Sequence, residues 1–284
     1  MIEPLRHFLL IAEHATYTRA ARHAHVSQPA ITASIRRLEE TLEARLFDRG
    51  RHGATLTEAG RALLPHARAA VVAIDEGRRA VSALEELEGG EVRLGGGTTA
   101  CTYLLPPVLS AFRKQHPKVT LRLREMPEQL AVDAFDAGEL DLVVANAESR
   151  GELFRDETVV LIAPAGVDPA SLPFVTFTPG SAVRSMLERH FPEAVIAMEL
   201  ASISTVKGSV RAGLGKALIS KSAVVTDLAL GRLVEVNDPR VPLPRPLHLL
   251  SRGVERLGPA ARALRLMLLS DAPRRRRANR PEKR

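Results

Sequence analysis

Residues 27–38 combine helix-forming and hydrogen-bonding side chains in a pattern that suits contact with DNA. On an α-helix, Arg36 would lie opposite the apolar side, while Gln28 and Thr32 would flank the N-terminal end. Glutamine can bind adenine bidentately, threonine can touch a base edge or a thymine methyl, and arginine can reach guanine or a phosphate. An ordinary amphipathic surface helix could carry the same residue types, so the flanking segments must decide.

The same stretch has local signals that start and orient a helix. Ser27 is a good N-cap because its hydroxyl can accept a free backbone N–H, and Pro29 falls in the first turn, where a missing N–H breaks no helical bond. Ile31, Ile35 and Leu38 recur at helical spacing and form one apolar stripe. The sequence therefore predicts a helix that begins at Ser27 and buries this stripe.

The segments on either side predict a winged helix-turn-helix. Upstream, apolar residues at positions 5, 8, 9 and 12 indicate one helix, and Thr18 could cap a second helix that ends shortly before Ser27. Downstream, residues 45–49 and 54–57 have the pattern of short strands around a Gly-Arg-His-Gly turn, which would form a hairpin. In such a domain the second helix of the pair enters the major groove, and Arg51 at the hairpin tip can enter a minor groove.

Five short motifs in this region resemble, in order and in spacing, the N-terminal signature of LysR-type transcriptional regulators. They are Thr18-Arg19-Ala20-Ala21, Val26-Ser27-Gln28-Pro29-Ala30, Ile35-Arg36-Arg37-Leu38-Glu39, Leu46-Phe47-Asp48-Arg49 and Leu56-Thr57-Glu58-Ala59-Gly60. Ala33 departs from the pattern, since many members carry a polar or basic residue there. The resemblance and the side-chain chemistry together nominate seven DNA-binding residues: Thr18, Ser27, Gln28, Pro29, Thr32, Arg36 and Arg51.

Length and composition place the chain among ordinary globular proteins. It has 284 residues, of which 45% are hydrophobic and 26% charged, enough for a small domain and one or two medium lobes with apolar cores. No apolar run approaches the roughly 20 residues that cross a bilayer, and Cys101 is the single cysteine. We therefore expect a cytoplasmic protein without a membrane span or disulfides.

Most of the net charge lies near the C-terminal end of the sequence. Residues 271–284 carry seven Lys and Arg against two acidic residues, so they account for +5 of the formal net charge of +7. This tail has two prolines and no periodic apolar residues, a composition that predicts disorder. It is either a solvated terminus or an auxiliary arm that contacts phosphates.

A long amphipathic helix is predicted from Glu58 to Glu88, between a cap at Thr57 and a Gly-Gly stop. Small and branched residues recur along it in steps of four and three, the spacing of a coiled-coil seam. They are Leu63, Ala67, Ala70, Ile74, Gly77, Val81 and Leu84. This seam predicts a dimer, although it could instead pack on the chain's own second domain. The resemblance implies antiparallel pairing of these linker helices and often a tetramer.

Beyond residue 89, short strands and helices alternate in a β-α-β-α-β order, which predicts a parallel sheet. A second lobe is predicted from about residue 158 to 243, and the first lobe comprises about 91–157 and 244–270. Two α/β lobes joined by crossing strands would form a cleft at the hinge. This is the layout of periplasmic solute-binding proteins, which the effector domains of LysR-type regulators resemble.

Polar loops at the ends of the predicted strands form the candidate ligand site. Ligands of open α/β sheets bind there, beside helix N-termini whose free N–H groups attract anions. These loops, some of which match effector-contact loops of the family, nominate Thr98, Thr99, Asn146, Ser181, Ser202, Ile203 and Ser204. Helix capping by Ser181 and Thr205 would explain their hydroxyls without any ligand. Together with a cation from Lys207 or Lys216, the hydroxyls predict a small organic anion. Lys216 could instead extend into solvent.

The sequence lacks the motifs of common enzyme sites. Gly213-Leu214-Gly215-Lys216 fails as a phosphate loop because Val210 replaces the leading glycine and Ala217 replaces the Ser or Thr. One cysteine excludes a Cys-x-x-Cys site, the N-terminal histidines lack metal-ligand spacing, and no nucleophile-base pair is visible. Cys101 could be a redox sensor at a helix start or a small packed residue. We expect no catalytic site, metal or cofactor.

The sequence thus predicts α and α/β architecture in four parts. They are a winged helix-turn-helix DNA-binding domain (1–57), a linker and dimerisation helix (58–88), a two-lobed, periplasmic-binding-protein-like effector domain (89–270) and a basic tail (271–284). The predicted function is a sequence-specific transcriptional regulator that binds double-stranded promoter DNA as a homodimer or homotetramer and responds to a small anionic effector. An activator of this kind would contact RNA polymerase. The competing hypothesis is a ligand-binding or enzymatic α/β protein whose helix-turn-helix serves protein contact, but the wing and the intact recognition signature argue against it.

Overall fold

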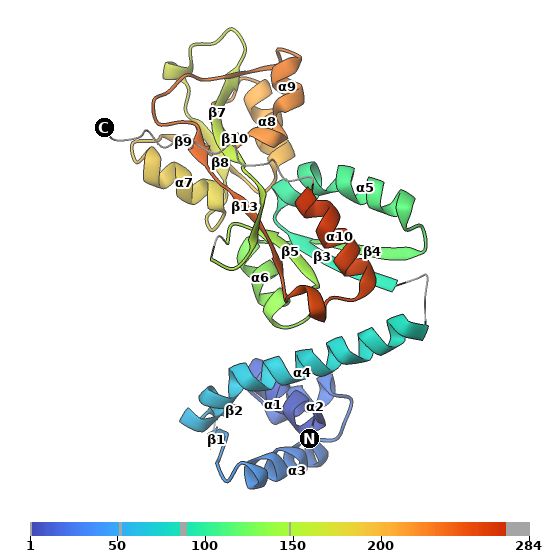
Figure 1. The fold of residues 1–284 in the computed structure, drawn as a ribbon. Helices are drawn as coiled ribbons and strands as arrows, with labels where there is room; N and C mark the ends of the chain where they lie inside the picture. The colour runs from blue at the N-terminus through green and yellow to red at the C-terminus, as the bar shows by residue number, and fades with distance from the viewer. Residues whose placement is uncertain (1, 51–52, 86–89, 148, 271–284) are drawn as a thin grey trace, which may run out of the picture. The chain divides into compact units, whose positions relative to one another are not determined.

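The computed structural model describes residues 2–50, 53–85, 90–147 and 149–270 (Figure 1). The chain divides into two units whose main boundary falls between residues 87 and 88. The first unit is mainly helical, whereas the second contains the large sheets. Within the described ranges, no helix combines the length and the apolarity that a membrane crossing requires.

The N-terminal unit contains a three-helix domain with a short hairpin, followed by a long helix. Its elements are α1 (Ile2–His14), α2 (Tyr17–His23), α3 (Gln28–Thr41), β1 (Phe47–Gly50), β2 (Gly53–Leu56) and α4 (Glu58–Glu85). The first three helices turn their apolar stripes toward one shared core, in which Phe8, Ile11, Ile31 and Ile35 are completely buried. The predicted helix-turn-helix and the hairpin after it are confirmed.

One helix start in this unit differs from the prediction. Thr16 caps α2, because its hydroxyl accepts a backbone N–H from the first turn at 3.3 Å, and Thr18 therefore lies inside the helix. The reason is Ala15, whose left-handed φ of 55° ends α1 and leaves Thr16 extended, as a cap residue must be. The predicted cap of α3 is confirmed, since the Ser27 hydroxyl accepts the N–H of Ala30 at 3.3 Å.

The hairpin is fixed to the helices at a position that requires glycine. Gly53 has a φ of 125°, and a Cβ there would lie 2.3 Å from the carbonyl oxygen of Ala15. The same carbonyl accepts the N–H of Ala54 at 2.7 Å. This close approach holds the predicted wing against the turn between α1 and α2.

The long helix α4 starts as predicted, with the Thr57 hydroxyl accepting the N–H of Gly60 at 3.0 Å. Its predicted end at Glu88 lies outside the described residues. The apolar stripe along it has two parts. Ala67 is buried in the core of the N-terminal domain, whereas Ile74 and Val81 are 45% and 60% exposed. The second part of the stripe is thus open to another helix.

The first lobe of the second unit is a five-stranded sheet in the order β4-β3-β5-β13-β6. Its elements are β3 (Gly90–Gly96), a π-helical turn η1 (Ala100–Leu104), α5 (Leu105–Gln115), β4 (Val119–Glu125), α6 (Glu128–Asp136), β5 (Leu142–Ala145), β6 (Glu152–Arg155), β13 (Leu247–Ser251), η4 (Val254–Arg256) and α10 (Pro259–Ser270). As predicted, β3, β4 and β5 are parallel, while β13 runs antiparallel to both of its neighbours. Helices α5 and α10 cover one face and α6 covers the other (Figure 1).

The second lobe combines an antiparallel sheet around β7 with a separate parallel pair, β8 and β9. Its elements are β7 (Thr158–Pro164), η2 (Pro169–Ser171), β8 (Phe174–Phe177), α7 (Ala182–His190), β9 (Ile196–Leu200), α8 (Ile203–Arg211), β10 (Ala217–Ser220), η3 (Lys221–Ala223), α9 (Val225–Ala229), β11 (Leu233–Glu235) and β12 (Leu243–Pro244). Helix α8 begins earlier than a cap at Thr205 would imply. Ser202 is its cap in place of Thr205, because the Ser202 hydroxyl accepts the Thr205 N–H at 3.2 Å.

Two crossing segments join the lobes, residues 156–157 between β6 and β7 and residues 245–246 between β12 and β13. Their backbones are paired, since the N–H of Arg245 donates to the carbonyl of Glu157 at 2.8 Å. The buried Glu157 carboxylate accepts the N–H of Ser222, in the second lobe, at 3.0 Å. The hinge between the lobes is therefore a hydrogen-bonded pair of short extended segments.

Candidate functional site

Helix α3 presents the predicted DNA-binding side chains on its outward side. The outward residues are Gln28, Pro29, Thr32 and Arg36. All are exposed except Thr32, which is half-buried, and the apolar stripe behind them is buried. Ser27 uses its hydroxyl as the helix cap, and Thr18 is exposed in the first turn of α2. Arg51 lies outside the described residues. The arrangement offers a polar helix face to a DNA groove, with the base contacts themselves still predictions.

A polar contact inside the core ties α3 to α1. Ser34 is only 3% exposed, and its hydroxyl lies 2.8 Å from Nδ1 of His7. Burial lowers the pKa of His7 below its ordinary value of 6.5, and the charge of Glu3 opposes this shift without cancelling it. His7 is therefore neutral at pH 7, and its contact with Ser34 holds the buried side of α3 against α1.

We expect the N-terminal domain to lose stability as the pH falls below about 6.5. The pKa of His7 is lower in the folded chain than in the unfolded chain, so the unfolded chain binds the proton first and is favoured. The stability that His7 contributes is present above the unfolded pKa and is lost as the pH falls through the folded pKa. Thermal unfolding at about pH 7 and about pH 5 measures this loss.

His7→Asn is the matched variant for this pH dependence, because an amide can still hydrogen-bond Ser34 but does not titrate. The variant is expected to lose less stability than the wild type between the two pH values. Equal losses in the two proteins would show that another group is responsible.

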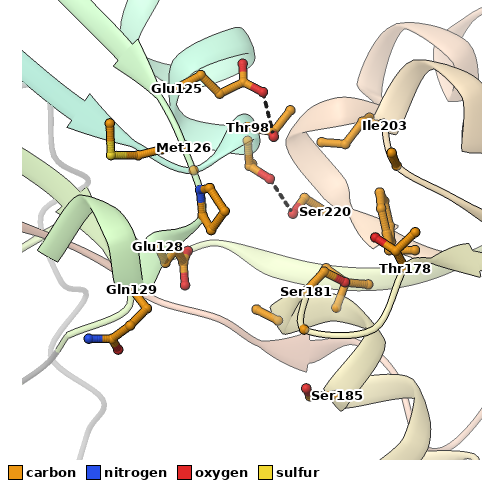
Figure 2. A pocket seen from close by; sticks show the side chains of 18 of the residues that line it. Thr98, Glu125, Met126, Glu128, Gln129, Thr178, Ser181, Ser185, Ile203 and Ser220 are labelled. Atoms are coloured by element: carbon orange, nitrogen blue, oxygen red, sulfur yellow. Dashed lines mark hydrogen bonds between the residues drawn. The ribbon is translucent and has the colours of Figure 1, made fainter. Parts of the chain in front are cut away.

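A cavity of about 750 Å³ lies between the two lobes of the second unit. Figure 2 shows Thr98, Glu125 and Glu128 on its first-lobe side, with Thr178 and Ser181 on the second-lobe side. The first turns of α6, α7 and α8 all contribute to the lining. Since the first four N–H groups of a helix have no partner within that helix, this is a suitable place for a hydrogen-bond acceptor.

Four of the seven predicted effector-binding residues line this cavity and three do not. Those in the lining are Thr98, Thr99, Ser181 and Ile203. Ser202 lies outside it and caps α8, with its hydroxyl 3.0 Å from that of Ser204, so both hydroxyls serve the start of this helix. Asn146 is exposed after β5 and also lies outside the lining.

The cavity contains a buried cation that no sequence motif marked. Arg245 is 6% exposed and enters the lining from the second crossing segment. Its Nη2 donates to the carboxylate of Glu128 at 2.5 Å, and its Nη1 lies 3.5 Å from the Thr99 hydroxyl and 3.4 Å from the Ser220 hydroxyl. Within the described part of the chain, its Nε has no hydrogen-bond partner. The one signal in the sequence is a proline on each side of Arg245, which favours an extended backbone.

Neither of the lysines that the sequence suggested as a cation lines the cavity. Lys207 donates to the carboxylate of Asp227 at 2.8 Å. Lys216 neither extends freely into solvent nor reaches the cleft, because its Nζ donates to the carbonyl of Pro169 at 2.8 Å. Among the described residues, the cation that lines the cavity is therefore Arg245.

Glu125 and Glu128 complete the set of charged side chains that the described residues contribute to the lining. Glu125 accepts the Thr98 hydroxyl at 2.8 Å and the Thr102 hydroxyl at 3.4 Å, whereas Glu128 is paired with Arg245. Across the described ranges, no group of three or more His, Cys, Asp or Glu side chains is arranged to hold a metal ion.

Cys101 is packed beside this site and does not open into it. Its thiol donates to the carbonyl of Gly96 at 3.3 Å. Burial, with a smaller contribution from Glu125, raises the pKa of the thiol to about 12. Almost no thiolate is present at neutral pH, and the reactive form of cysteine is therefore absent. These properties favour a packed residue over a redox sensor.

We expect Cys101 to resist a thiol-specific disulfide reagent in the native protein and to react with one equivalent in denaturant. Because it is the single cysteine in the chain, the released chromophore reports this residue alone. Labelling of the native protein at the rate of a free thiol would contradict the packed role.

Family comparisons agree with this architecture. Residues 2–61 match the model of the bacterial regulatory helix-turn-helix protein, lysR family, and residues 85–273 match the LysR substrate binding domain. The chain belongs to the LysR family. The RuBisCO operon transcriptional regulator of Allochromatium vinosum is 33% identical to it, over 96% of this chain and 97% of that protein.

Two solved structures share the fold of this regulator. ArgP from Mycobacterium tuberculosis has a TM-score of 0.64 at 19% identity, covering 92% of this chain and 96% of that one. DarR from Vibrio fischeri, solved in complex with DNA, has a TM-score of 0.57 at 22% identity, covering 95% and 98%. These likenesses support the winged helix-turn-helix and the two-lobed domain.

Family membership establishes the general function. The regulator binds DNA through its N-terminal domain and takes an effector in its second domain. Its relatives are transcriptional regulators and not enzymes, which confirms the prediction of a non-enzymatic protein. The family match favours a DNA-binding regulator over a ligand-binding or enzymatic α/β protein whose helix-turn-helix serves protein contact.

Proposed function

We propose that this regulator controls a RuBisCO operon in response to a small organic anion bound between the lobes of its effector domain. The target follows from the regulator of Allochromatium vinosum, because a third of the residues are identical over nearly the whole of both chains. The ligand class rests on one observation, the buried guanidinium of Arg245 in the lining of the cavity. A buried cation of this kind favours a ligand with an acidic group.

The proposal assigns roles to the parts of the chain. Residues 1–57 bind the promoter, 58–88 pair two protomers, 89–270 bind the effector, and 271–284 form a basic tail. The DNA contacts are assigned to Thr18, Ser27, Gln28, Pro29, Thr32, Arg36 and Arg51, and the effector contacts to Thr98, Thr99, Ser181, Ile203 and Arg245. Exposed Ile74 and Val81 support pairing through α4 into a dimer or tetramer. The regulator acts in the cytoplasm and, where it activates, contacts RNA polymerase.

An effector in this position would act by favouring one arrangement of the two lobes. Thr98 and Thr99 come from the first lobe, Ser181 and Ile203 from the second, and Arg245 from a crossing segment. A ligand that touches all three parts binds more tightly to the arrangement in which they are correctly spaced, so it shifts the population toward that arrangement. Linker-helix pairing would pass the change to the DNA-binding domains.

The experiment that tests this function is genome-wide capture of DNA fragments by the purified protein at physiological salt. Non-specific electrostatic binding weakens strongly there, whereas base contacts persist. A few sharp sites with an interrupted dyad, upstream of RuBisCO genes, are expected. Uniform enrichment that disappears with salt and has no shared motif would overturn the proposal. Sharp sites beside other genes would overturn the assigned target.

A further inference from the structure

We infer that Glu128 is a built-in competitor of the effector: its carboxylate occupies the anion position at Arg245, and an acidic ligand binds by displacing it. The inference rests on the proposed acidic ligand. It adds that competition by Glu128 sets the affinity and the charge selectivity of the site. The occupied position is visible in the structure as the 2.5 Å contact between Glu128 and Nη2 of Arg245.

Arg245 has donor capacity that Glu128 does not use. A guanidinium carries five N–H donors and binds a carboxylate best through two parallel hydrogen bonds. Glu128 accepts one strong contact, from Nη2, while Nη1 makes only contacts of 3.4–3.5 Å to two hydroxyls. Within the described residues, the buried Nε has no partner. A ligand acid group could therefore satisfy Arg245 more fully than Glu128 does.

Glu128 is the partner that can move. Its side chain is 24% exposed, compared with 7% for Arg245, and it is the first residue of α6, at the edge of the cavity. Arg245 is held by prolines on either side and by the backbone pairing of its N–H with Glu157. A carboxylate at a helix N-terminus is favoured by the helix dipole even without an arginine. Displaced from Arg245, Glu128 would therefore keep a favourable position.

The exchange explains why the site would select acids. A buried cation without a counter-ion is strongly unfavourable, so Arg245 must be paired whether or not the cleft is occupied. Only a ligand that carries its own negative charge can release Glu128 and leave Arg245 paired. A neutral ligand would either leave Glu128 in place or leave the guanidinium without a counter-ion, and both cases disfavour its binding at this position.

The same position connects both lobes. The Thr99 hydroxyl, from the first lobe, lies 3.0 Å from the Ser220 hydroxyl, from the second, and both lie beside Nη1 of Arg245. A ligand acid group that replaces Glu128 would reach this bridge and the crossing segment at once. Binding of the ligand would therefore change the contacts at the junction of the two lobes.

The test compares Glu128→Gln with Glu125→Gln in the full chain. Each variant removes one negative charge from the same cavity, but only Glu128 is bonded to Arg245. Inorganic phosphate and malonate serve as probes, and their dissociation constants are measured from the increase in the thermal midpoint with ligand concentration. We expect Glu128→Gln to bind both anions about tenfold more tightly than the wild type, and Glu125→Gln to show a change several times smaller.

A second variant, Glu128→Gln with Arg245→Gln, keeps the result interpretable because it leaves no unpaired buried charge. It is expected to fold and to lose the binding of both anions. Tight binding by this double variant would overturn the inference. If the wild type binds the anions, equal changes of the dissociation constants in Glu128→Gln and Glu125→Gln would overturn it too. Failure of both anions to bind any of these proteins would overturn the proposed acidic ligand as well. The proposed DNA target would be unaffected, because the capture experiment tests it separately.

Discussion

Replacement of Gln28 and Arg36 by alanine is expected to abolish specific promoter binding while the protein remains folded. Both side chains are exposed on α3, and the apolar stripe that anchors the helix is untouched. A good contact to a base edge is worth about 1–3 kcal/mol, so loss of two lowers specific affinity by about 30-fold or more. Fluorescence anisotropy with a captured promoter fragment and with an unrelated fragment of equal length measures the effect.

The matched control removes the same two side-chain types from the second unit. Arg113→Ala with Gln115→Ala lies at the exposed end of α5 and changes the net charge equally. It is expected to keep the ratio of specific to non-specific affinity, whereas Gln28→Ala with Arg36→Ala brings that ratio close to one. If both double variants lowered affinity for the two fragments equally, α3 would contribute charge alone and the assigned base contacts would be wrong.

The recognition helix was predictable because its signals are local. A Ser cap, a proline in the first turn and apolar residues at helical spacing all lie within residues 27–38, and Ile31 and Ile35 are completely buried as the pattern requires. The parallel direction of β3, β4 and β5 was predictable for the same reason, since the alternation of strands and helices along the chain is enough to predict it.

Helix starts were less predictable where two hydroxyl residues compete. Thr16 and Thr18, and likewise Ser202 and Thr205, have the same capping chemistry, and the backbone angle decides which one is the cap. For α8 this choice matters to function. Ser202 was predicted to contact the effector because its loop matches an effector-contact loop of the family, and in the structure its hydroxyl caps the helix.

The pair of Glu128 and Arg245 could not be predicted, because the contact joins residues 117 positions apart. Glu128 looks like an ordinary acidic residue at a helix start, and Arg245 lies in a proline-rich return without periodicity. Only the pairing of the two crossing segments places this arginine beside the loops of the first lobe. Contacts of this kind depend on topology, and a local pattern carries no information about them.

Phe8→Ala is expected to unfold the N-terminal domain and leave the effector domain folded. Phe8 is completely buried, and the centroid of its ring lies 5.3 Å from the ring centroid of Phe47. Truncation of a buried phenylalanine costs about 3–5 kcal/mol, a large part of the total stability of a small domain. Calorimetry would show loss of the transition that belongs to the N-terminal domain, and promoter binding would be lost with it.

Phe112→Ala provides the reciprocal variant, because Phe112 is equally buried in the core of the first lobe of the effector domain. The two phenylalanines belong to separate apolar cores, so each truncation should lower the stability of one domain and change the other little. Phe8→Ala should therefore keep the thermal shift caused by phosphate or malonate, and Phe112→Ala should lose it. Simultaneous loss of both transitions in either variant would show that the domains unfold as one cooperative unit, and the DNA-binding and effector functions could then not be separated by mutation of their cores.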